Sequence, residues 1–410
     1  PTTVVSFLGT GRKNRPEDPR AGYAQTTYRF AYANDNHLEL TTSLFGVGLL
    51  RFLCTQGKEI DRWIVLGTSA SLWSELNQAL DKPDDVLEQY CQIDDKVEKR
   101  VVNKEDLQAW QQVLNSHASS CEVRLCLTGE ALEPESQQQI CRALFEHVPR
   151  NNDLVFDVSH GFRHQPVIAS HVVSLMRWTH GIRNVAFFSG VYEARQSDVT
   201  PVLELPICQE LVEAAEAAAI LEMTGNYESV ATHLGLDANL AWFMESTNQL
   251  SKSKAPAREL SSKTLLNDNE SVIRVELAKL LNHRLQWAQE DTFALRFQQV
   301  VRTALDHGDY FRAIVLGYEA LKIHAGRLLK LGDPLAFETR YDAERQLFER
   351  LSSQHLDIVK RLQWARNACA HGTLAPNATA QQVLLSPANF RKLIEQALQL
   401  MDELPALLNV

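Results

Sequence analysis

Short apolar runs alternate with helical patterns over the first half of the chain. Five runs of strand length each end in a turn of small residues: Thr3–Leu8, Trp63–Leu66, Cys121–Leu127, Asp153–Val158 and Asn184–Phe188. Continuous apolar strands separated by helices are typical of a parallel sheet whose two faces are both covered. The pattern therefore predicts an α/β domain with a parallel-rich sheet over about residues 1–205.

The pattern changes near residue 207. Glycine and β-branched runs become rare, and Ala/Glu/Leu-rich helical segments continue to the C-terminus. We expect an all-α connector over residues 206–285 and an all-α domain over residues 286–410. Two polar stretches, Ser251–Pro256 and Ser261–Lys263, predict a loop within the helical region.

Composition indicates a folded, soluble protein. Hydrophobic residues make up 45% of the chain and charged residues 22%. No apolar run approaches the roughly 18 residues of a membrane span, and no apolar leader precedes the first strand, so a cytoplasmic location without membrane contact is expected. The seven cysteines include no CxxC pair. Reduced thiols fit this pattern better than a zinc site, and no metal is expected.

The net charge of −10 argues against stable DNA binding or tight, non-specific binding to long nucleic acid. The acidic excess lies in the first 285 residues, because 14 Lys and Arg balance 14 Asp and Glu from residue 286 onward. Contact with nucleic acid is therefore expected only at a local site in the C-terminal part.

Small and hydroxyl residues follow the predicted strands, at Gly9-Thr10-Gly11, Gly67-Thr68-Ser69, Thr128-Gly129, Ser159-His160-Gly161 and Ser189-Gly190. The carboxyl ends of parallel strands line one crevice, where glycines let backbone N–H groups approach phosphate. The hydroxyls could donate to phosphate or ribose, and Arg12 and Arg163 add positive charge. Each turn alone is an ordinary βα connection, but five together favour an anionic ligand. The first turn lacks the third glycine of a dinucleotide fingerprint.

The segment Asp157-Val-Ser-His-Gly-Phe-Arg163 resembles the DxTHG signature of CRISPR-associated CARF domains, with Ser159 in place of Thr. Together with the Gly-Thr-Gly-Arg turn, the resemblance implies a Rossmann-like sensor of cyclic oligoadenylate, in which two domains pair around one ligand. The family's habits favour four adenylates over six. The resemblance implies that this ligand is an allosteric activator, and its expected contacts are Gly9, Thr10, Gly11, Arg12, Gly67, Thr68, Ser69, His160, Gly161, Phe162, Arg163, Ser189 and Gly190.

A second motif, Arg-x4-His, occurs at Arg366/His371. The same spacing occurs at Arg142/His147, Arg302/His307 and Arg350/His355, so spacing alone cannot select a site. Of the four matches, only the one at Arg366 has a polar residue of the usual kind, Asn367, directly after the arginine. Small residues and then Gly372 follow, which predicts a helix end. We interpret the other three matches as solvated helix faces.

The Arg366–His371 segment resembles the HEPN ribonuclease signature. Cleavage without metal needs the RNA 2′-OH to attack phosphorus and the 5′-oxygen to leave. His371 suits general acid–base transfer, and Arg366 suits the charge of the phosphorane. Asn367 would orient the phosphate. The resemblance implies that two chains meet to form one composite site. Glu319 either pairs with Arg366 or is an ordinary surface carboxylate.

The sequence therefore predicts a CARF–HEPN ribonuclease of type III CRISPR defence. Cyclic oligoadenylate would activate a homodimer, with further association left open, to cut single-stranded RNA into 2′,3′-cyclic phosphate or 3′-phosphate and 5′-OH ends. No cofactor is expected for catalysis. One alternative is a ligand sensor whose helical half is a non-catalytic dimerisation or regulatory module. Another is that the N-terminal half also degrades its activator.

Overall fold

The computed structural model describes residues 1–11, 23–32, 36–117, 121–246, 250–263, 271–372 and 378–410. The chain divides into two compact units, Pro1–Val212 and Glu213–Val410. Each unit has its own hydrophobic core.

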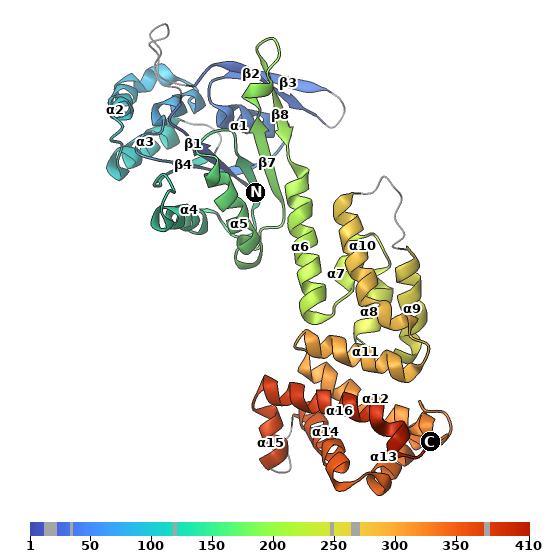
Figure 1. Cartoon of the computed structure of the whole chain (residues 1–410). Helices are drawn as coiled ribbons and strands as arrows, with labels where there is room; N and C mark the ends of the chain where they lie inside the picture. The colour runs from blue at the N-terminus through green and yellow to red at the C-terminus, as the bar shows by residue number, and fades with distance from the viewer. Residues whose placement is uncertain (12–22, 33–35, 118–120, 247–249, 264–270, 373–377) are drawn as a thin grey trace. The chain divides into compact units, whose positions relative to one another are not determined.

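Unit 1 is built on an eight-stranded sheet with the order β3-β2-β8-β7-β6-β1-β4-β5 (Figure 1). Five of its strand pairs are parallel, and two, β2–β3 and β7–β8, are antiparallel. The predicted parallel-rich α/β fold is thus confirmed. The strands are β1 (Thr2–Leu8), β2 (Thr26–Ala31), β3 (His37–Thr42), β4 (Ile60–Gly67), β5 (Glu122–Leu127), β6 (Asp153–Asp157), β7 (Val185–Gly190) and β8 (Val199–Glu204).

Helices cover both faces of this sheet. Alternate side chains of a central strand enter different cores: Val4 of β1 packs in one cluster, whereas Val5 and Phe7 pack in the other. The first cluster includes α1 (Phe45–Thr55), α2 (Leu87–Glu98), α3 (Lys104–His117), and the 3₁₀ segments η1 (Trp73–Ala79) and η2 (Pro83–Val86). The second includes α4 (Pro134–His147) and α5 (His164–Thr179). A further 3₁₀ turn, η3, spans Tyr192–Ala194.

Helix α6 (Pro206–Thr224) crosses the boundary between the units, and all elements after it are helical. One hydrophobic cluster extends from Ala214 to Leu408, so residues 213–285 share a core with residues 286–410. The functional division at residue 285 stays a prediction. The helices are α7 (Glu228–His233), α8 (Ala238–Ser246), α9 (Leu250–Lys263), α10 (Val272–Arg284), η4 (Gln286–Gln289), α11 (Phe293–Asp306), α12 (Tyr310–Leu328), α13 (Phe337–Arg350), α14 (Ser353–His371), α15 (Ala378–Leu384) and α16 (Pro387–Leu407).

The predicted polar loop at Ser251–Lys263 is wrong, because α9 covers this segment with Pro256 inside the helix. Ala257 and Leu260 are fully buried in the core of unit 2. Tertiary packing of these residues outweighs the local loop signal. None of the helices in the described part of the chain combines the length and apolar content needed to cross a bilayer.

Candidate functional sites

The predicted ligand turns gather at one edge of the sheet. Strands β7, β6, β1 and β4 are consecutive neighbours and run parallel, so the turns that follow them lie side by side. Strand β1 is flanked by β4 on one side and by β6 on the other. The chain order therefore reverses beside β1, which is where open α/β sheets bind ligands.

Two glycines let the turns after β1 and β6 touch. A Cβ atom on Gly9 would lie 3.0 Å from the Gly161 backbone nitrogen. Gly161 itself has a φ of +86°, and a Cβ there would lie 2.8 Å from Phe7. The two turns can approach this closely only without side chains at these positions. Gly67 and Gly190 are also packed closely, against Trp73 and Tyr28 respectively.

His160 is held inside this edge by two contacts. Its ring stacks on Tyr23 with 4.1 Å between centroids, and its Nε2 accepts a hydrogen bond of 3.3 Å from the Phe45 N–H at the start of α1. Burial lowers the pKa of His160 to about 4. The ring is therefore neutral at pH 7 with its proton on Nδ1, which leaves one N–H donor. A neutral donor can contact a phosphate or a base without adding charge.

Tyr23 is a site residue that the sequence did not indicate. Its hydroxyl accepts from the Gly9 N–H at 2.6 Å and donates to the Gly9 carbonyl at 3.0 Å. Burial raises the pKa of this hydroxyl well above its ordinary value. Tyr23 therefore fixes the first turn by satisfying both backbone groups of Gly9, and its ring supports His160.

The predicted hydroxyl contacts differ in their accessibility. Thr68 is buried, and its Oγ1 accepts from the Ala70 N–H at 3.3 Å, so it holds its own turn. The Ser159 Oγ accepts from the Gly190 N–H at 2.8 Å, which ties β6 to β7. In contrast, Ser69 is exposed and Thr10 is partly exposed. Thr10, Ser69 and the partly exposed Ser189 are thus hydroxyls that a ligand can reach.

The remaining predicted contacts are also at this edge. Arg163 is exposed at the N-cap of α5, and Phe162 stacks on the His164 ring at 5.7 Å. Gly11, with a φ of +63°, and Ser189 are partly exposed. Arg12, which was expected to supply the second positive charge, lies outside the described residues. The set of ligand contacts therefore stays a prediction, and its described members lie in the turns at one edge of the sheet.

Asp157, the first residue of the CARF-like motif, lies beneath these turns. Its side chain is buried, and Oδ1 accepts a hydrogen bond of 2.9 Å from the Ser159 N–H. Burial raises the pKa of Asp157 to about 6, and hydrogen bonds from Ser159 act in the opposite direction. Asp157 therefore supports the turn that carries Ser159 and His160.

The nuclease-like motif lies on one helix of unit 2. Arg366 and Asn367 belong to α14, and His371 is its last residue. Gly372 follows in the left-handed conformation with a φ of +62°, which confirms the predicted helix end. Arg366 Nη1 donates to Asn367 Oδ1 at 2.9 Å, so Asn367 orients the guanidinium.

Glu319 of α12 pairs with Arg366. The Arg366 Nη2 atom lies 3.5 Å from Glu319 Oε1, and Glu319 also contacts Lys322 Nζ at 2.9 Å and Arg340 Nη1 at 2.8 Å. The Glu319 side chain is only 16% exposed, so it is not an ordinary surface carboxylate. The pairing considered from the sequence is present, and one carboxylate holds three cations beside the motif.

Arg366 and His371 point in different directions within a single chain. Five residues of α-helix correspond to about 7.5 Å of rise and about 140° of rotation. Arg366 turns toward Glu319 in the helical core, whereas His371 is exposed at the helix end. One helix thus presents the two groups on separate faces.

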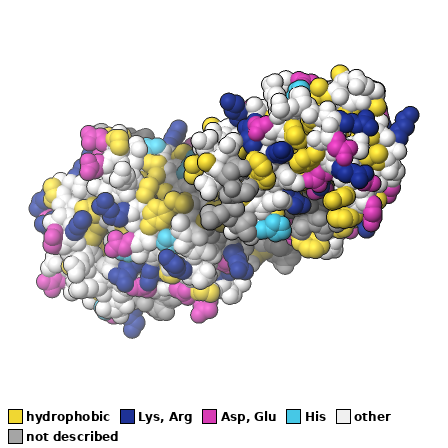
Figure 2. Space-filling model, turned by 90° about the horizontal axis from the view of Figure 1, so that it is seen from below, with side chains coloured by type: hydrophobic (Ala, Val, Ile, Leu, Met, Phe, Trp, Pro, Cys, Tyr) yellow, Lys and Arg dark blue, Asp and Glu magenta, His cyan; other side chains and the backbone are white. Residues whose placement is uncertain are grey.

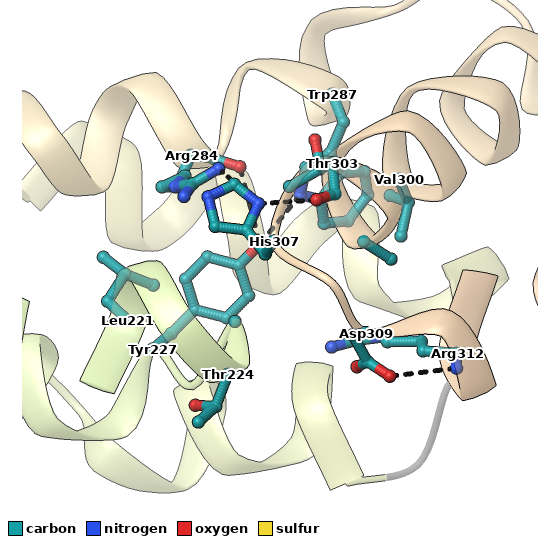
Figure 3. A pocket seen from close by; sticks show the side chains of 12 residues that line it. Leu221, Thr224, Tyr227, Arg284, Trp287, Val300, Thr303, His307, Asp309 and Arg312 are labelled. Carbon is teal, nitrogen blue, oxygen red and sulfur yellow. Dashed lines mark hydrogen bonds between the residues drawn. The ribbon is translucent and has the colours of Figure 1, made fainter. Parts of the chain in front are cut away.

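The interpretation of His307 as part of a solvated helix face is wrong. Its side chain is 18% exposed, its Nε2 lies 3.2 Å from Glu222 Oε2, and its Nδ1 lies 2.5 Å from the Thr303 carbonyl oxygen. Arg284 completes the group with two contacts to Glu222, of 2.8 and 2.5 Å. His307, Arg284 and Thr303 border a cavity of about 30 Å³ (Figure 3). Such a space suits water rather than a nucleotide.

Charge on the described surface is mixed. On the face shown in Figure 2, Lys and Arg side chains alternate with Asp and Glu side chains rather than forming one basic tract. Among the described residues, no group of three or more His, Cys, Asp or Glu is arranged to hold a metal ion.

Comparisons with known proteins give distant structural likenesses only. No protein-family model matches the chain, and no curated protein sequence matches it significantly. Among solved structures, Enterococcus italicus Csm6 bound to cyclic hexa-2′-fluoro-hexa-dAMP aligns with 100% of this chain and 97% of its own. The sequence identity is 11% and the TM-score is 0.32.

Proposed function

We propose that this protein is a metal-independent endoribonuclease that cuts single-stranded RNA and is activated by cyclic oligoadenylate, as an ancillary nuclease of type III CRISPR defence. The observation that carries the proposal is the environment of Arg366. Asn367 and Glu319 hold this guanidinium on the helix that ends in the exposed His371. A fixed guanidinium with an accessible imidazole is the pair that metal-free RNA cleavage needs.

The proposed reaction starts with attack of the 2′-oxygen on the neighbouring phosphorus. One imidazole removes the 2′-OH proton, Arg366 stabilises the extra charge of the phosphorane, and a second imidazole protonates the leaving 5′-oxygen. The products are a 2′,3′-cyclic phosphate, or its hydrolysed 3′-phosphate form, and a 5′-OH. A homodimer supplies both imidazoles, because each chain contributes one His371.

Activation begins at the strand-end turns of unit 1. Cyclic oligoadenylate, for which we favour the four-membered ring, contacts the turns after β1, β4, β6 and β7. The Nδ1–H of His160 and the exposed Arg163 are the donors best placed for its phosphates. The ligand activates the enzyme if it binds the cleavage-competent dimer more tightly than the resting one.

Digestion of labelled single-stranded RNA, with and without cyclic tetra- or hexa-adenylate, tests the proposal. We expect ligand-dependent cleavage that His371→Ala lowers by on the order of 100-fold or more, since general acid–base catalysis contributes this much. His355→Ala is the matched control, because it belongs to another Arg-x4-His match and its ring faces Glu403 at 3.6 Å. Ligand binding without cleavage by the unmodified protein would instead favour a sensor with a regulatory helical domain.

A further inference from the structure

A buried tyrosine lies against the guanidinium of the nuclease-like motif. Tyr318 belongs to α12, directly before Glu319, and is only 3% exposed. The Cζ atom of Arg366 lies 5.9 Å from the centre of the Tyr318 ring, and Lys322 Nζ lies 4.6 Å from the same centre. Both distances are within the roughly 6 Å over which the face of an aromatic ring attracts a cation. One ring therefore supports two cations.

The hydroxyl of Tyr318 is anchored by a network that joins three helices. It donates a hydrogen bond of 2.5 Å to Glu344 Oε1 of α13, and Gln363 Nε2 of α14 donates to the same oxygen. Burial and the bond to Glu344 raise the pKa of the hydroxyl well above its ordinary value, so it keeps its proton and stays a donor. Gln363 lies one turn before Arg366 and Asn367 on α14. The network thus ties α12 and α13 to the motif helix one turn from Arg366.

The polar contacts of Arg366 do not by themselves fix the plane of its guanidinium. Asn367 Oδ1 accepts a hydrogen bond from Nη1, and Glu319 Oε1 lies 3.5 Å from Nη2. Contacts at these two atoms hold the edge of the planar group but leave the plane free to tilt. The Tyr318 ring, which lies against Cζ, opposes this tilt. The orientation of the guanidinium therefore depends on the ring as well as on its polar partners.

Glu344 strengthens the attraction between the ring and the guanidinium. A phenol that donates a hydrogen bond to a carboxylate gains electron density, and such polarisation is larger in a buried, low-dielectric site. The attraction of a cation to a ring depends on the negative charge of the ring face. Glu344 therefore acts on Arg366 through Tyr318.

We propose that Tyr318 is a positioning residue for RNA cleavage: its ring, polarised by Glu344, holds the Arg366 guanidinium in the orientation that stabilises the phosphorane. This inference rests on the proposed function and adds two residues that act on the reaction without touching the RNA. Their effect on the rate passes through Arg366. Removing Arg366 should therefore also remove the effect of Tyr318.

A double-mutant cycle on the cleavage rate tests this dependence. It compares the unmodified protein, Tyr318→Leu, Arg366→Ala and the double variant, with whichever of cyclic tetra- and hexa-adenylate activates the unmodified protein. We expect Tyr318→Leu to lower kcat by on the order of 10-fold, as for a lost cation–π contact in a desolvated site, and to change KM by less than about 2-fold. In the Arg366→Ala background, which should itself lose about 100- to 1000-fold, the same substitution should change kcat by less than about 2-fold.

Two further variants separate positioning from packing. Tyr318→Phe keeps the ring and loses the bond to Glu344, so its kcat should lie between those of the unmodified protein and Tyr318→Leu. Tyr310→Leu is the matched control, because Tyr310 is also on α12 and its ring packs 5.8 Å from the Phe390 ring. Eight residues, or about 12 Å of helix, separate it from Tyr318. Any loss of kcat from Tyr310→Leu should be the same factor with and without Arg366.

Urea-induced unfolding of the same four proteins of the cycle needs no RNA. Because Tyr318→Leu and Arg366→Ala remove one shared contact, their losses in the free energy of unfolding should be less than additive. Additive losses would overturn the inference, as would an equal loss of kcat from Tyr318→Leu in both backgrounds or a Tyr318→Phe protein that is as slow as Tyr318→Leu. If the unmodified protein cuts no RNA, the proposed function and the positioning role both fail. Less-than-additive unfolding losses in that protein would retain the contact of Tyr318 with Arg366, so the two failures are distinguishable.

Discussion

The Asp157→Asn variant should gain stability relative to the unmodified protein as the pH rises. Asp157 is fully buried at the end of β6, and burial raises its pKa from the ordinary value of 3.8 to about 6. The folded protein therefore holds the carboxyl proton up to a higher pH than the unfolded chain does. The contribution of the protonated Asp157 carboxyl to the free energy of unfolding is fully present below pH 3.8 and is lost as the pH rises through about 6.

The size of the effect follows from the two pKa values. A difference of about two units corresponds to roughly 3 kcal/mol, at about 1.4 kcal/mol per unit. The Asn side chain cannot ionise, and its oxygen can still accept the hydrogen bond from the Ser159 N–H. The free energy of unfolding of Asp157→Asn, minus that of the unmodified protein, should therefore increase by up to about 3 kcal/mol between pH 4 and pH 7.

Urea-induced unfolding at intervals between pH 4 and pH 7.5 measures this difference directly. Subtracting the two proteins at each pH removes the contributions of all other titrating groups. Asp153→Asn, at the other end of β6, is the control, because Asp153 is only partly buried and accepts from the Asn184 side chain. A difference that stays constant with pH, or that falls as pH rises, would refute the account of Asp157 as a buried carboxyl with a raised pKa.

Two further substitutions test the packing of the two sites. Gly161→Ala should lower the free energy of unfolding by about 2 kcal/mol or more and weaken binding of cyclic tetra-adenylate, because its Cβ would meet Phe7 at 2.8 Å. The control is Gly57→Ala, where φ is +72° and no atom lies within 4 Å of the added Cβ. It should cost only about 1 kcal/mol in thermal unfolding. Glu319→Gln should lower the free energy of unfolding by about 2 kcal/mol and slow RNA cleavage, because three cations lose their shared carboxylate. Asp342→Asn removes an exposed pair and should change stability by less than about 1 kcal/mol, so equal losses in these two variants would contradict the role of Glu319.

The central strands could be predicted because their sequence pattern reflects burial on both faces. Every residue of β1 is buried, and β4 has five consecutive buried residues at its end, which gives an unmistakable apolar run. Strands β2 and β3 alternate buried and exposed residues and contain several polar side chains, so no such run marks them. Strand β2 joins the sheet by pairing with β8, more than 150 residues away, and β3 joins it through β2, which local pattern cannot reveal.

The candidate site residues divide in a similar way. Arg366 and Asn367 could be identified from the sequence because the motif is local and lies on one helix. The roles of Tyr23 and His307 could not be identified in this way, because they arise from contacts between distant residues. Tyr23 contacts Gly9, and His307 contacts Glu222, which is 85 residues away. Neither tyrosine nor histidine stands out by type in its own segment. Such roles become visible only when the fold brings the partners together.

The geometry of α14 also explains why a single chain is not expected to cut RNA. Arg366 is turned inward to Glu319, and His371 is exposed five residues later, about 140° around the helix. One imidazole cannot both remove the 2′-OH proton and protonate the 5′-oxygen at the same moment. Ala370 beside it is small and exposed, which leaves room for a second helix to approach. Two copies of this helix end would place two imidazoles around one phosphate, with each Arg366 kept in place by its own Glu319. In the proposed dimer, the carboxylate would restrict the guanidinium before the partner arrives, so that less conformational freedom would be lost when the composite site forms.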